Sequence, residues 1–291
     1  MKEIVVISGK GGTGKTSFTA SLALLAGKNA VIADCDVDAA DMHLLMKPVV
    51  KTSENFFSGV VAEIDPNKCT NCGICADKCR FNAIPFIDSQ YTINTLNCEG
   101  CGYCEKICPV DAIKMNSMNV GDWYISSTKA DNIMVHAKLG IGAENSGKLV
   151  AKVKNEAKRI AQETRTDFII VDGSPGIGCP VVSSLSGAHF VLLVTEPSVS
   201  GLHDLKRVYQ LVQKFKLKAG CVINKSDINP AKTDEIIEFL KKESIHHIAN
   251  LPYDENFTKA MTVGQTIVEF DNGELRNKIV ESWEKVKELV K

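Results

Sequence analysis

The sequence predicts an α/β fold in which a doubly wound, mostly parallel sheet receives a small inserted α+β domain. Three features indicate it: short apolar runs alternate with helical patterns, a glycine-rich loop follows the first of these runs, and an internal repeat interrupts the alternation. A chain of 291 residues, 44% of them hydrophobic, is long enough to bury the cores of two ordinary domains.

Six apolar runs rich in β-branched residues are expected to form buried parallel strands. They cover residues 4–9, 29–36, 167–174, 189–196, 219–225 and 247–252. Helical patterns between them indicate a sheet that is covered on both faces. The tail after Gly273 is predicted to be a final helix packed on the core, because its charges are mixed and its apolar side chains share one stripe, Leu275, Ile279, Trp283 and Val286.

The inserted segment, 62–115, is dense in cysteine, asparagine and glycine and contains an internal repeat. The cysteines of "KCTNCGICADKCRFNAI" (68–84) coincide with those of "NCEGCGYCEKICPVDAI" (97–113) at a shift of 29 residues. We therefore expect a small domain at 62–115 within a larger domain made of 1–61 and 116–291. Beyond the insert, the glycine-rich start of 130–163 is expected to be a loop, and its later part a helix.

Charge and hydropathy argue against several classes of function. The chain has 34 basic and 35 acidic residues, so it has no surplus of positive charge for nucleic acid. The N-terminal "MKE" lacks the apolar region of a signal peptide, and no run of about 20 apolar residues could span a bilayer. We therefore expect a cytoplasmic protein that binds neither nucleic acid nor membrane, and in which eight of the 11 cysteines serve as metal ligands rather than as disulfides.

A phosphate-binding loop is predicted between the first strand and the next helix, where Gly9 to Thr16 fits G-x-x-x-x-G-K-[ST]. Its glycines leave backbone N–H groups free to surround phosphate oxygens, Lys15 supplies charge to the β- and γ-phosphates, and the Thr16 hydroxyl is suited to ligate Mg²⁺. The expected nucleotide-binding residues of this loop are Gly9, Gly11, Gly12, Thr13, Gly14, Lys15, Thr16 and Ser17.

A second stretch, "GAENSGK" (142–148), has the same glycine and lysine spacing but differs in its context. No strand precedes it, and Leu149, which follows, cannot bind Mg²⁺. We expect a loop and the start of a helix there. A contact between Lys148 and a nucleotide or a partner is the alternative.

The string "KGGTGKT" (10–16) resembles the deviant Walker A motif of the MinD/ParA-like ATPases, a group that includes the nitrogenase iron protein. The resemblance implies that Lys10 reaches across a dimer interface to the γ-phosphate bound by the partner. Since Lys15 already offsets charge within one subunit, a cation supplied by the other subunit makes the dimer depend on nucleotide.

Other signatures of the same family follow along the chain. "ADCDVDAAD" (33–41) resembles switch I, which implies that Asp36 orients the attacking water; its neighbours Asp34, Asp38 and Asp41 either assist or belong to a solvated loop. "IIVDGSPG" (169–176) resembles Walker B and switch II, which implies Mg²⁺ binding through water at Asp172 and a γ-phosphate contact at Gly176. "VINK" and "LPYDENF" imply base or nucleoside contacts at Asn224, Pro252 and Asp254.

Eight cysteines form two runs of C-x₂-C-x₂-C-x₃-C, the pattern of two-cluster bacterial ferredoxins. In that pattern the fourth cysteine of each run ligates the other cluster. One [4Fe–4S] cluster is thus expected on Cys69, Cys72, Cys75 and Cys108, and the second on Cys98, Cys101, Cys104 and Cys79. Zinc is the alternative, although zinc sites usually pair two C-x₂-C units across a longer gap. Arg80 replaces the proline that usually follows the first run, but that proline ligates nothing.

The other three cysteines lie outside the repeat. Cys35 and Cys221 lie in apolar strand runs and are expected to be inert core thiols. Cys179 follows Asp172 at the spacing at which the nitrogenase iron protein places a ligand of its bridging cluster. The sequence between Cys108 and Cys179 lacks the second cysteine that such a cluster needs, so burial of Cys179 beside switch II is favoured over a bridging cluster.

These features predict a slow, partner-stimulated ATPase that couples nucleotide-dependent dimerisation to electron transfer or metal-centre maturation. Its expected cofactors are ATP, Mg²⁺ and two [4Fe–4S] clusters. Its expected partners are a second copy or a paralogous ATPase, and a redox protein. The alternatives are an iron–sulfur cluster carrier or assembly ATPase, and a positioning or partition ATPase.

Overall fold

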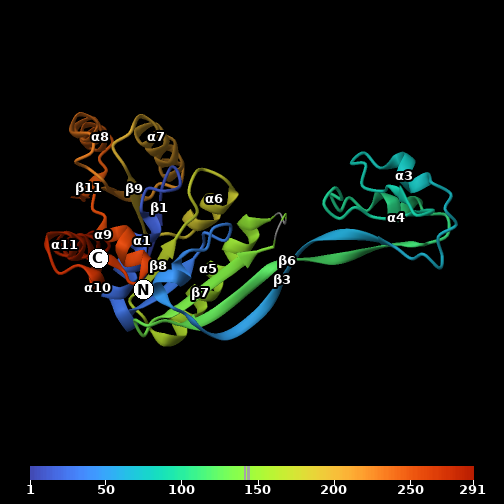
Figure 1. Cartoon of the computed structure of the whole chain (residues 1–291), viewed down its shortest axis with the longest axis horizontal. Helices are drawn as coiled ribbons and strands as arrows, with labels where there is room; N and C mark the ends of the chain where they lie inside the picture. The colour runs from blue at the N-terminus through green and yellow to red at the C-terminus, as the bar shows by residue number, and fades with distance from the viewer. Residues whose placement is uncertain (141, 143–144) are drawn as a thin grey trace. The chain divides into compact units, whose positions relative to one another are not determined.

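The computed structural model describes residues 1–140, 142 and 145–291, and its chain forms two compact units (Figure 1). Unit 1 comprises residues 1–54, 122–139 and 146–291, and unit 2 comprises 55–121 and 140–145. The predicted insert, 62–115, falls within unit 2. Two residues of the "GAENSGK" stretch, 143 and 144, lie outside the described residues, and the helix expected there begins at Ser146.

Unit 1 is built on a mostly parallel sheet, as the sequence predicts. Its strands are β1 (Lys2–Ile7), β2 (Ala30–Asp34), β7 (Ile133–Leu139), β8 (Phe168–Asp172), β9 (Phe190–Thr195), β10 (Lys218–Ile223) and β11 (His246–Asn250). Their order is β11-β10-β9-β1-β8-β2-β7, followed at one edge by β6 (Ile113–Ser127) and β3 (Val49–Ile64). Neighbours from β11 to β7 pair in parallel, so their carboxyl ends meet at one edge.

Helices cover both faces of this sheet because successive side chains of each buried strand point to opposite faces. Ile4 and Val6 of β1 join one core cluster with α1 and α11, and β1 also packs with α6. The helices of unit 1 are α1 (Lys15–Ala26), η1 (Gly27–Asn29), α2 (Met42–Met46), α5 (Ser146–Thr164), α6 (Cys179–Leu185), α7 (Val199–Lys214), α8 (Pro230–Lys242), α9 (Asn256–Thr262), α10 (Ile267–Phe270) and α11 (Glu274–Leu289).

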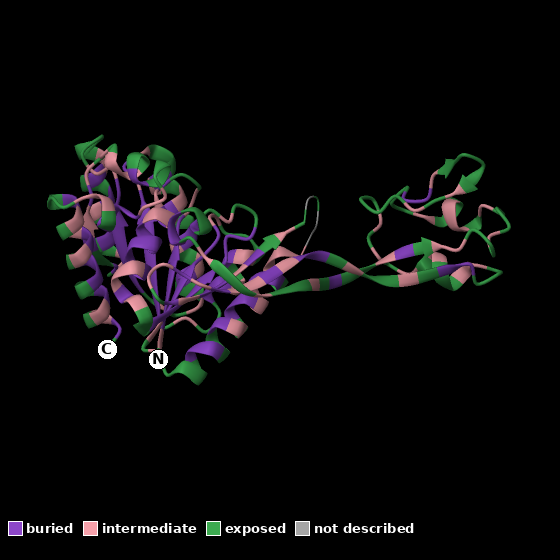
Figure 2. Cartoon of the chain, turned by 60° about the horizontal axis from the view of Figure 1, so that its bottom comes forward, coloured by how far each residue is buried: buried purple, intermediate pink, exposed green. Residues whose placement is uncertain are grey.

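Packing among these helices separates the two layers. α1 packs with α2, α10 and α11, whereas α5 packs with α6. The predicted stripe of the tail is confirmed, because α11 buries Leu275, Ile279, Trp283 and Val286. Figure 2 shows the buried strands between these layers.

Three strands of this sheet, β7, β3 and β6, lie outside the predicted set. The prediction of a loop at the start of 130–163 is wrong, since β7 begins at Ile133 and pairs with β2. Its sequence, "IMVHAKL", carries a histidine and a lysine, which weakens the apolar signal. β3 is largely exposed, so it shows no alternation of apolar and polar residues. Both β3 and β6 run from unit 1 into unit 2 and provide covalent connections between them.

Unit 2 repeats its local structure at the 29-residue shift. Its short helices α3 (Ile74–Lys78) and α4 (Tyr103–Ile107) each follow a glycine with positive φ, Gly73 at 75° and Gly102 at 69°. The other small elements are β4 (Phe86–Ile87) and β5 (Gln90–Tyr91). Each helix ends one residue before the fourth cysteine of its run, which caps it, so both runs fold alike.

Backbone hydrogen bonds pair the two repeats crosswise. Asp65 precedes the first run, and Ala112 follows the second. The N–H of Asp65 donates to the carbonyl of Ala112 at 2.7 Å. The N–H of Asn94 donates to the carbonyl of Ala83 at 2.8 Å in the equivalent way. The beginning of each repeat therefore lies beside the end of the other, and α3 packs against α4.

Candidate functional site

The glycine-rich loop of unit 1 joins the end of β1 to the first turn of α1. Gly14 caps the helix with φ 88°, a left-handed conformation that favours glycine, and a Cβ there would lie 2.4 Å from Nδ2 of Asn224. A Cβ on Gly9 would lie 2.5 Å from the backbone of Asp204. Close approach of backbone and side chain thus requires glycine at both positions.

A cluster of charges lies behind this loop at the carboxyl edge of the sheet. Lys15, only 5% exposed, places Nζ 3.0 Å from Oδ1 of Asp172 and 3.4 Å from Oδ2 of Asp36. The Thr16 hydroxyl donates to Oδ2 of Asp172 at 2.8 Å, and the Thr19 hydroxyl donates to Oδ1 at 2.9 Å. The structure therefore brings the predicted lysine, threonine and two aspartates together.

Charge pairing keeps this lysine protonated. Burial alone would lower the pKa of Lys15, but the carboxylates of Asp172 and Asp36 outweigh it and raise the pKa above its ordinary value. Burial raises the pKa of Asp36 and, far more strongly, that of Asp34, which Asp172 raises further. Three carboxyl groups face one ammonium, so a divalent cation would relieve their mutual repulsion.

The segment after β8 is tied to the loop and to the end of β2. The N–H of Gly176 donates to the carbonyl of Ser8 at 2.9 Å, and the Ser174 hydroxyl donates to the carbonyl of Cys35 at 2.8 Å. The N–H of Asp36 donates to Oδ1 of Asp34 at 3.2 Å, whereas Asp38 and Asp41 are exposed. A displacement of Gly176 would therefore be transmitted to the start of the phosphate loop.

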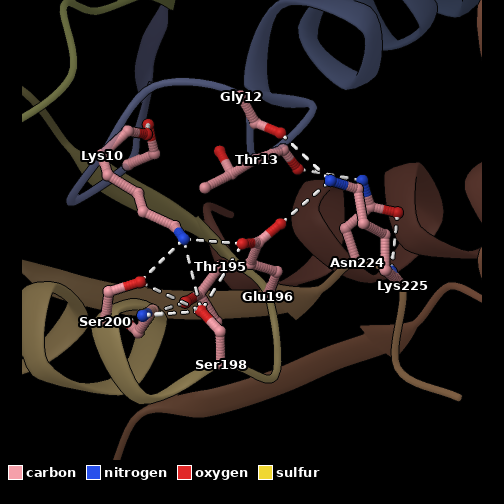
Figure 3. A network of polar contacts seen from close by, with 11 residues as sticks. Lys10, Gly12, Thr13, Thr195, Glu196, Ser198, Ser200, Asn224 and Lys225 are labelled. Atoms are coloured by element: carbon pink, nitrogen blue, oxygen red, sulfur yellow. Dashed lines mark hydrogen bonds and ion pairs between the residues drawn. The ribbon is translucent and has the colours of Figure 1, made fainter. Parts of the chain in front are cut away.

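Lys10 lies on the other side of the loop and contacts the end of β9 and the start of α7 (Figure 3). Its Nζ lies 2.6 Å from Oε1 of Glu196 and donates to the hydroxyls of Ser200 at 2.9 Å and Ser198 at 3.2 Å. Burial would raise the pKa of Glu196, but hydrogen bonds from Lys10 and Lys225 lower it below its usual range. Lys10 thus uses its three N–H donors within its own chain.

Asn224 and its neighbour fix the outer half of the same loop (Figure 3). Asn224 donates from Nδ2 to the carbonyl of Thr13 at 2.9 Å and accepts the N–H of Lys225 on Oδ1 at 3.0 Å. Lys225 Nζ donates to the carbonyl of Gly12 at 3.3 Å and pairs with Oε2 of Glu196 at 2.9 Å. Both side chains thus hold the carbonyls of the loop.

Sequence reasoning missed several of these contacting residues. Thr19 lies one helical turn after Lys15, a spacing that could have indicated it. Glu196 ends the predicted strand 189–196 and Ser198 lies two residues beyond it, and the carboxyl ends of parallel strands share one edge. The other missed residues of the network are Ser200 and Lys225. Pro252 and Asp254 lie at the same edge, after β11, and are partly exposed.

Two cavities in unit 2 collect the eight cysteines of the repeat. The larger, of about 500 Å³, is lined by the second run's first three cysteines together with Cys79 of the first run, and also by Cys75. A narrower cavity, of about 20 Å³, is lined by Cys69, Cys72, Cys75 and Cys108. These are the two sets of four that the ferredoxin pattern pairs, with Cys75 touching both cavities.

Backbone N–H groups point at the sulfurs in a repeated arrangement. Ala83 donates to Sγ of Cys79 at 3.4 Å, and Ala112 donates to Sγ of Cys108 at 3.3 Å. Cysteine thiolates hold iron–sulfur clusters, and hydrogen bonds to the sulfurs are one of the factors that set the cluster potential. Four soft donors around each cavity therefore fit an iron–sulfur cluster. Within the described ranges, no three His, Cys, Asp or Glu side chains converge on a single metal ion.

The remaining three cysteines differ in exposure. Cys35 and Cys221 are fully buried, as expected of core thiols, and burial raises the pKa of both. The prediction that Cys179 is buried is wrong, because Cys179 is exposed at the start of α6. It contacts Gly147 at the beginning of α5, where a Cβ would lie 3.1 Å from that of Cys179.

A parallel sheet whose first strand leads through a glycine loop into a helix, with a lysine and strand-end carboxylates behind it, defines a P-loop nucleotide-binding protein. Residues 4–267 match the CobQ/CobB/MinD/ParA nucleotide binding domain. The chain therefore belongs to this family and is a P-loop ATPase.

Individual relatives agree with this assignment. The chain is 33% identical to the uncharacterized protein MJ0578 of Methanocaldococcus jannaschii, covering 99% of this chain and 97% of that protein. It is 28% identical to MJ0579 of the same organism, over 97% and 96% of the two chains. The septum site-determining protein MinD of Pyrococcus horikoshii, solved with Mg-ADP, shares the fold with a TM-score of 0.59 and 18% identity, over 99% and 96%.

In the described part of the chain, no helix is both long enough and apolar enough to span a membrane.

Proposed function

We propose that the chain binds and hydrolyses Mg·ATP at the loop from Gly9 to Ser17 and couples ATP-dependent dimerisation to electron transfer or metal-centre maturation. Membership of a nucleotide-binding family supports the first part, and the MinD relative solved with Mg-ADP supports the metal. The observation that carries the second part is the crosswise repeat of unit 2, with its two cysteine-lined cavities.

Five residues at the phosphate loop and the strand ends beside it have proposed roles in hydrolysis. The buried Lys15 exchanges its carboxylate partners for the β- and γ-phosphates, and Thr16 ligates Mg²⁺ while Asp172 binds it through water. Asp36 orients the attacking water. Gly176 contacts the γ-phosphate, and its hydrogen bond to Ser8 couples its position to that of the loop.

Lys10 is proposed to act on the second subunit. Its present contacts with Glu196, Ser198 and Ser200 lie within one chain, so it must leave them to reach the partner's nucleotide. The second subunit is a further copy or a paralogue. The relation of this chain to two proteins of one organism, MJ0578 and MJ0579, supports a paralogous partner.

The two cavities of unit 2 are proposed to hold [4Fe–4S] clusters, which would supply one-electron transfer at low potential. The chain's own contribution is eight thiolates, the N–H groups of Ala83 and Ala112, and the turns that follow Gly73 and Gly102. β3 follows switch I along the chain, and β6 precedes Asp172. These strands therefore connect the cluster unit to segments whose neighbours contact nucleotide, and a redox protein would exchange electrons with unit 2.

Iron analysis tests the cluster proposal directly. Protein purified without oxygen should contain about eight iron atoms per chain, and Cys79→Ser or Cys108→Ser should each lower this to about four. The control Cys179→Ser changes an exposed thiol outside both cavities and should retain all the iron. Zinc in place of iron, or full iron content in both cavity variants, would refute the cluster assignment.

Redox titration tests the coupling. Cluster potentials are measured with ATP and with ADP in Asp36→Ala, which should bind ATP without hydrolysing it quickly. Since coupling is reciprocal, a change of potential on ATP binding requires a matching change of ATP affinity on reduction. Equal potentials and equal affinities would mean that the nucleotide and cluster sites act independently.

A second candidate function is a positioning or partition ATPase, which the MinD name of the P. horikoshii relative favours. Cosedimentation of the ATP-bound protein with DNA or with anionic liposomes tests this candidate. Transfer of iron to an acceptor protein that lacks its cluster tests the further alternative, a cluster carrier. Binding to DNA or liposomes that requires ATP would favour positioning over electron transfer.

A further inference from the structure

The two cysteine-lined cavities of unit 2 can be compared position by position, because the repeat relates their linings. A shift of 29 residues takes Cys79, which lines the larger cavity, to Cys108, which lines the narrower one. The same shift takes Arg80 to Pro109, and these residues also line the larger and the narrower cavity respectively. A difference between equivalent positions is therefore a difference in the surroundings of two equivalent sets of sulfurs.

Among the described residues, charged side chains line only one of the two cavities. The larger cavity is lined by Lys78, Arg80 and Glu99, whereas the narrower has no Lys, Arg, Asp or Glu in its lining. The repeat places Ile107 at the position of Lys78 and Thr70 at the position of Glu99. Two cations against one carboxylate leave the larger cavity with a net positive lining, and the narrower cavity has a neutral one.

Arg80 is the cation of this lining that carries the argument. Nζ of Lys78 lies 2.9 Å from Oδ2 of its neighbour Asp77, which offsets part of the lysine charge. The described chain places no carboxylate at ion-pair distance from the Arg80 guanidinium, and Arg80 is exposed. A guanidinium stays charged throughout the pH range in which proteins fold. Arg80 therefore adds a permanent positive charge to the cavity directly after Cys79, where the other repeat has an uncharged proline.

We propose that Arg80 makes the larger site the one that takes up an electron first. Four thiolates give each proposed cluster site an excess of negative charge, which an added electron increases. A fixed positive charge beside the site favours that increase, and greater access of water acts in the same direction. The narrower cavity, of about 20 Å³ and without charged side chains among its described residues, provides neither. This inference rests on the proposed clusters, and it adds an order in which the two sites are reduced.

Anaerobic redox titration of the full chain, followed by electron paramagnetic resonance, tests this order. We expect the larger site to be favoured about tenfold for the first electron, which corresponds to two midpoint potentials about 59 mV apart. Arg80→Gln removes the charge and keeps the backbone N–H, so it should lower the higher midpoint and bring it close to the other. Arg80→Lys keeps the charge and should retain most of the separation.

Three further variants assign the midpoints and control for net charge. Cys108→Ser should leave only the larger site occupied, so its single midpoint should match the higher one of the parent. Glu99→Gln removes the opposing charge of the same lining and should raise the higher midpoint. The control Lys106→Gln removes an exposed cation of α4 that lines neither cavity, and it should leave both midpoints unchanged.

Iron content, measured on the same samples, separates failure of the function from failure of the inference. If the parent holds no iron, the cluster proposal is overturned, and this inference with it. If the parent and Arg80→Gln each hold about eight iron atoms but share the same midpoints, Arg80 does not set the order and only the inference is overturned. The inference also fails if Lys106→Gln shifts the higher midpoint as much as Arg80→Gln does, since net charge alone would then explain the effect.

Discussion

Replacing Glu196 by glutamine should make ATP-dependent dimerisation easier. In the single chain, Glu196 binds Lys10 through Oε1 at 2.6 Å and Lys225 through Oε2 at 2.9 Å. If Lys10 acts on the partner's nucleotide, every dimer must first break the Lys10–Glu196 pair. Glutamine keeps the shape of the side chain and removes the charge that retains Lys10.

The size of this effect follows from the exposure of the pair. The Lys10 side chain is 28% exposed and that of Glu196 is 18% exposed, so solvent screens part of their attraction. The Lys10–Glu196 pair lies between an exposed ion pair and a buried charged hydrogen bond in its degree of burial. We therefore expect the pair to stabilise the single chain by about 1 kcal/mol. The ATP concentration at half-maximal dimerisation should therefore fall about fivefold in Glu196→Gln.

Sedimentation velocity at increasing ATP measures this midpoint in the parent, in Glu196→Gln, and in each with Lys10→Ala. The gain must disappear when Lys10 is alanine, because the glutamate then has no lysine to retain. Lys10→Ala by itself should bind nucleotide and remain monomeric. An unchanged midpoint in Glu196→Gln, or ATP-dependent dimerisation of either variant that carries Lys10→Ala, would refute the reasoning.

Two further perturbations test the site and the core of unit 1. Asp36→Ala should hydrolyse ATP about 100-fold more slowly, because a water-orienting group is removed, yet it should still dimerise. Phosphate release measures hydrolysis, and sedimentation measures dimerisation. Unchanged hydrolysis would show that Asp36 has no catalytic role. Burial, and secondarily His43, lowers the pKa of His136 from 6.5 to about 4 in the folded chain. Above pH 6.5 the histidine is neutral in both the folded and the unfolded chain. As the pH falls from 6.5 towards 4, the unfolded chain binds a proton that the folded chain does not, so folding stability is lost over this range. The parent should lose about 3 kcal/mol of unfolding free energy over this range that His136→Gln does not lose, measured by denaturant titration with tryptophan fluorescence; equal pH dependence in both would contradict the shift.

Much of the architecture could be predicted because its signals are local. The runs 167–174 and 189–196 are continuously apolar at their centres, 168–171 and 190–194, since strands buried on both faces need no polar alternation, and both form parallel strands. The loop from Gly9 to Ser17 depends on consecutive residues, and so does the helical stripe of α11. β3 was missed because most of its side chains are exposed and leave no periodic pattern.

What only the tertiary structure decided is which distant side chains meet. Asn224 reaches the carbonyl of Thr13 across 211 residues of sequence, and Lys10 reaches Ser198 across 188. Such contacts depend on the order of strands in the sheet, where β1 lies beside β9 and β9 beside β10. A local pattern shows that a strand is buried but not which strand pairs with it. The sequence by itself therefore determined where the phosphate loop and the two cysteine runs lie, and the sheet order determined which residues hold Lys10 and Asn224.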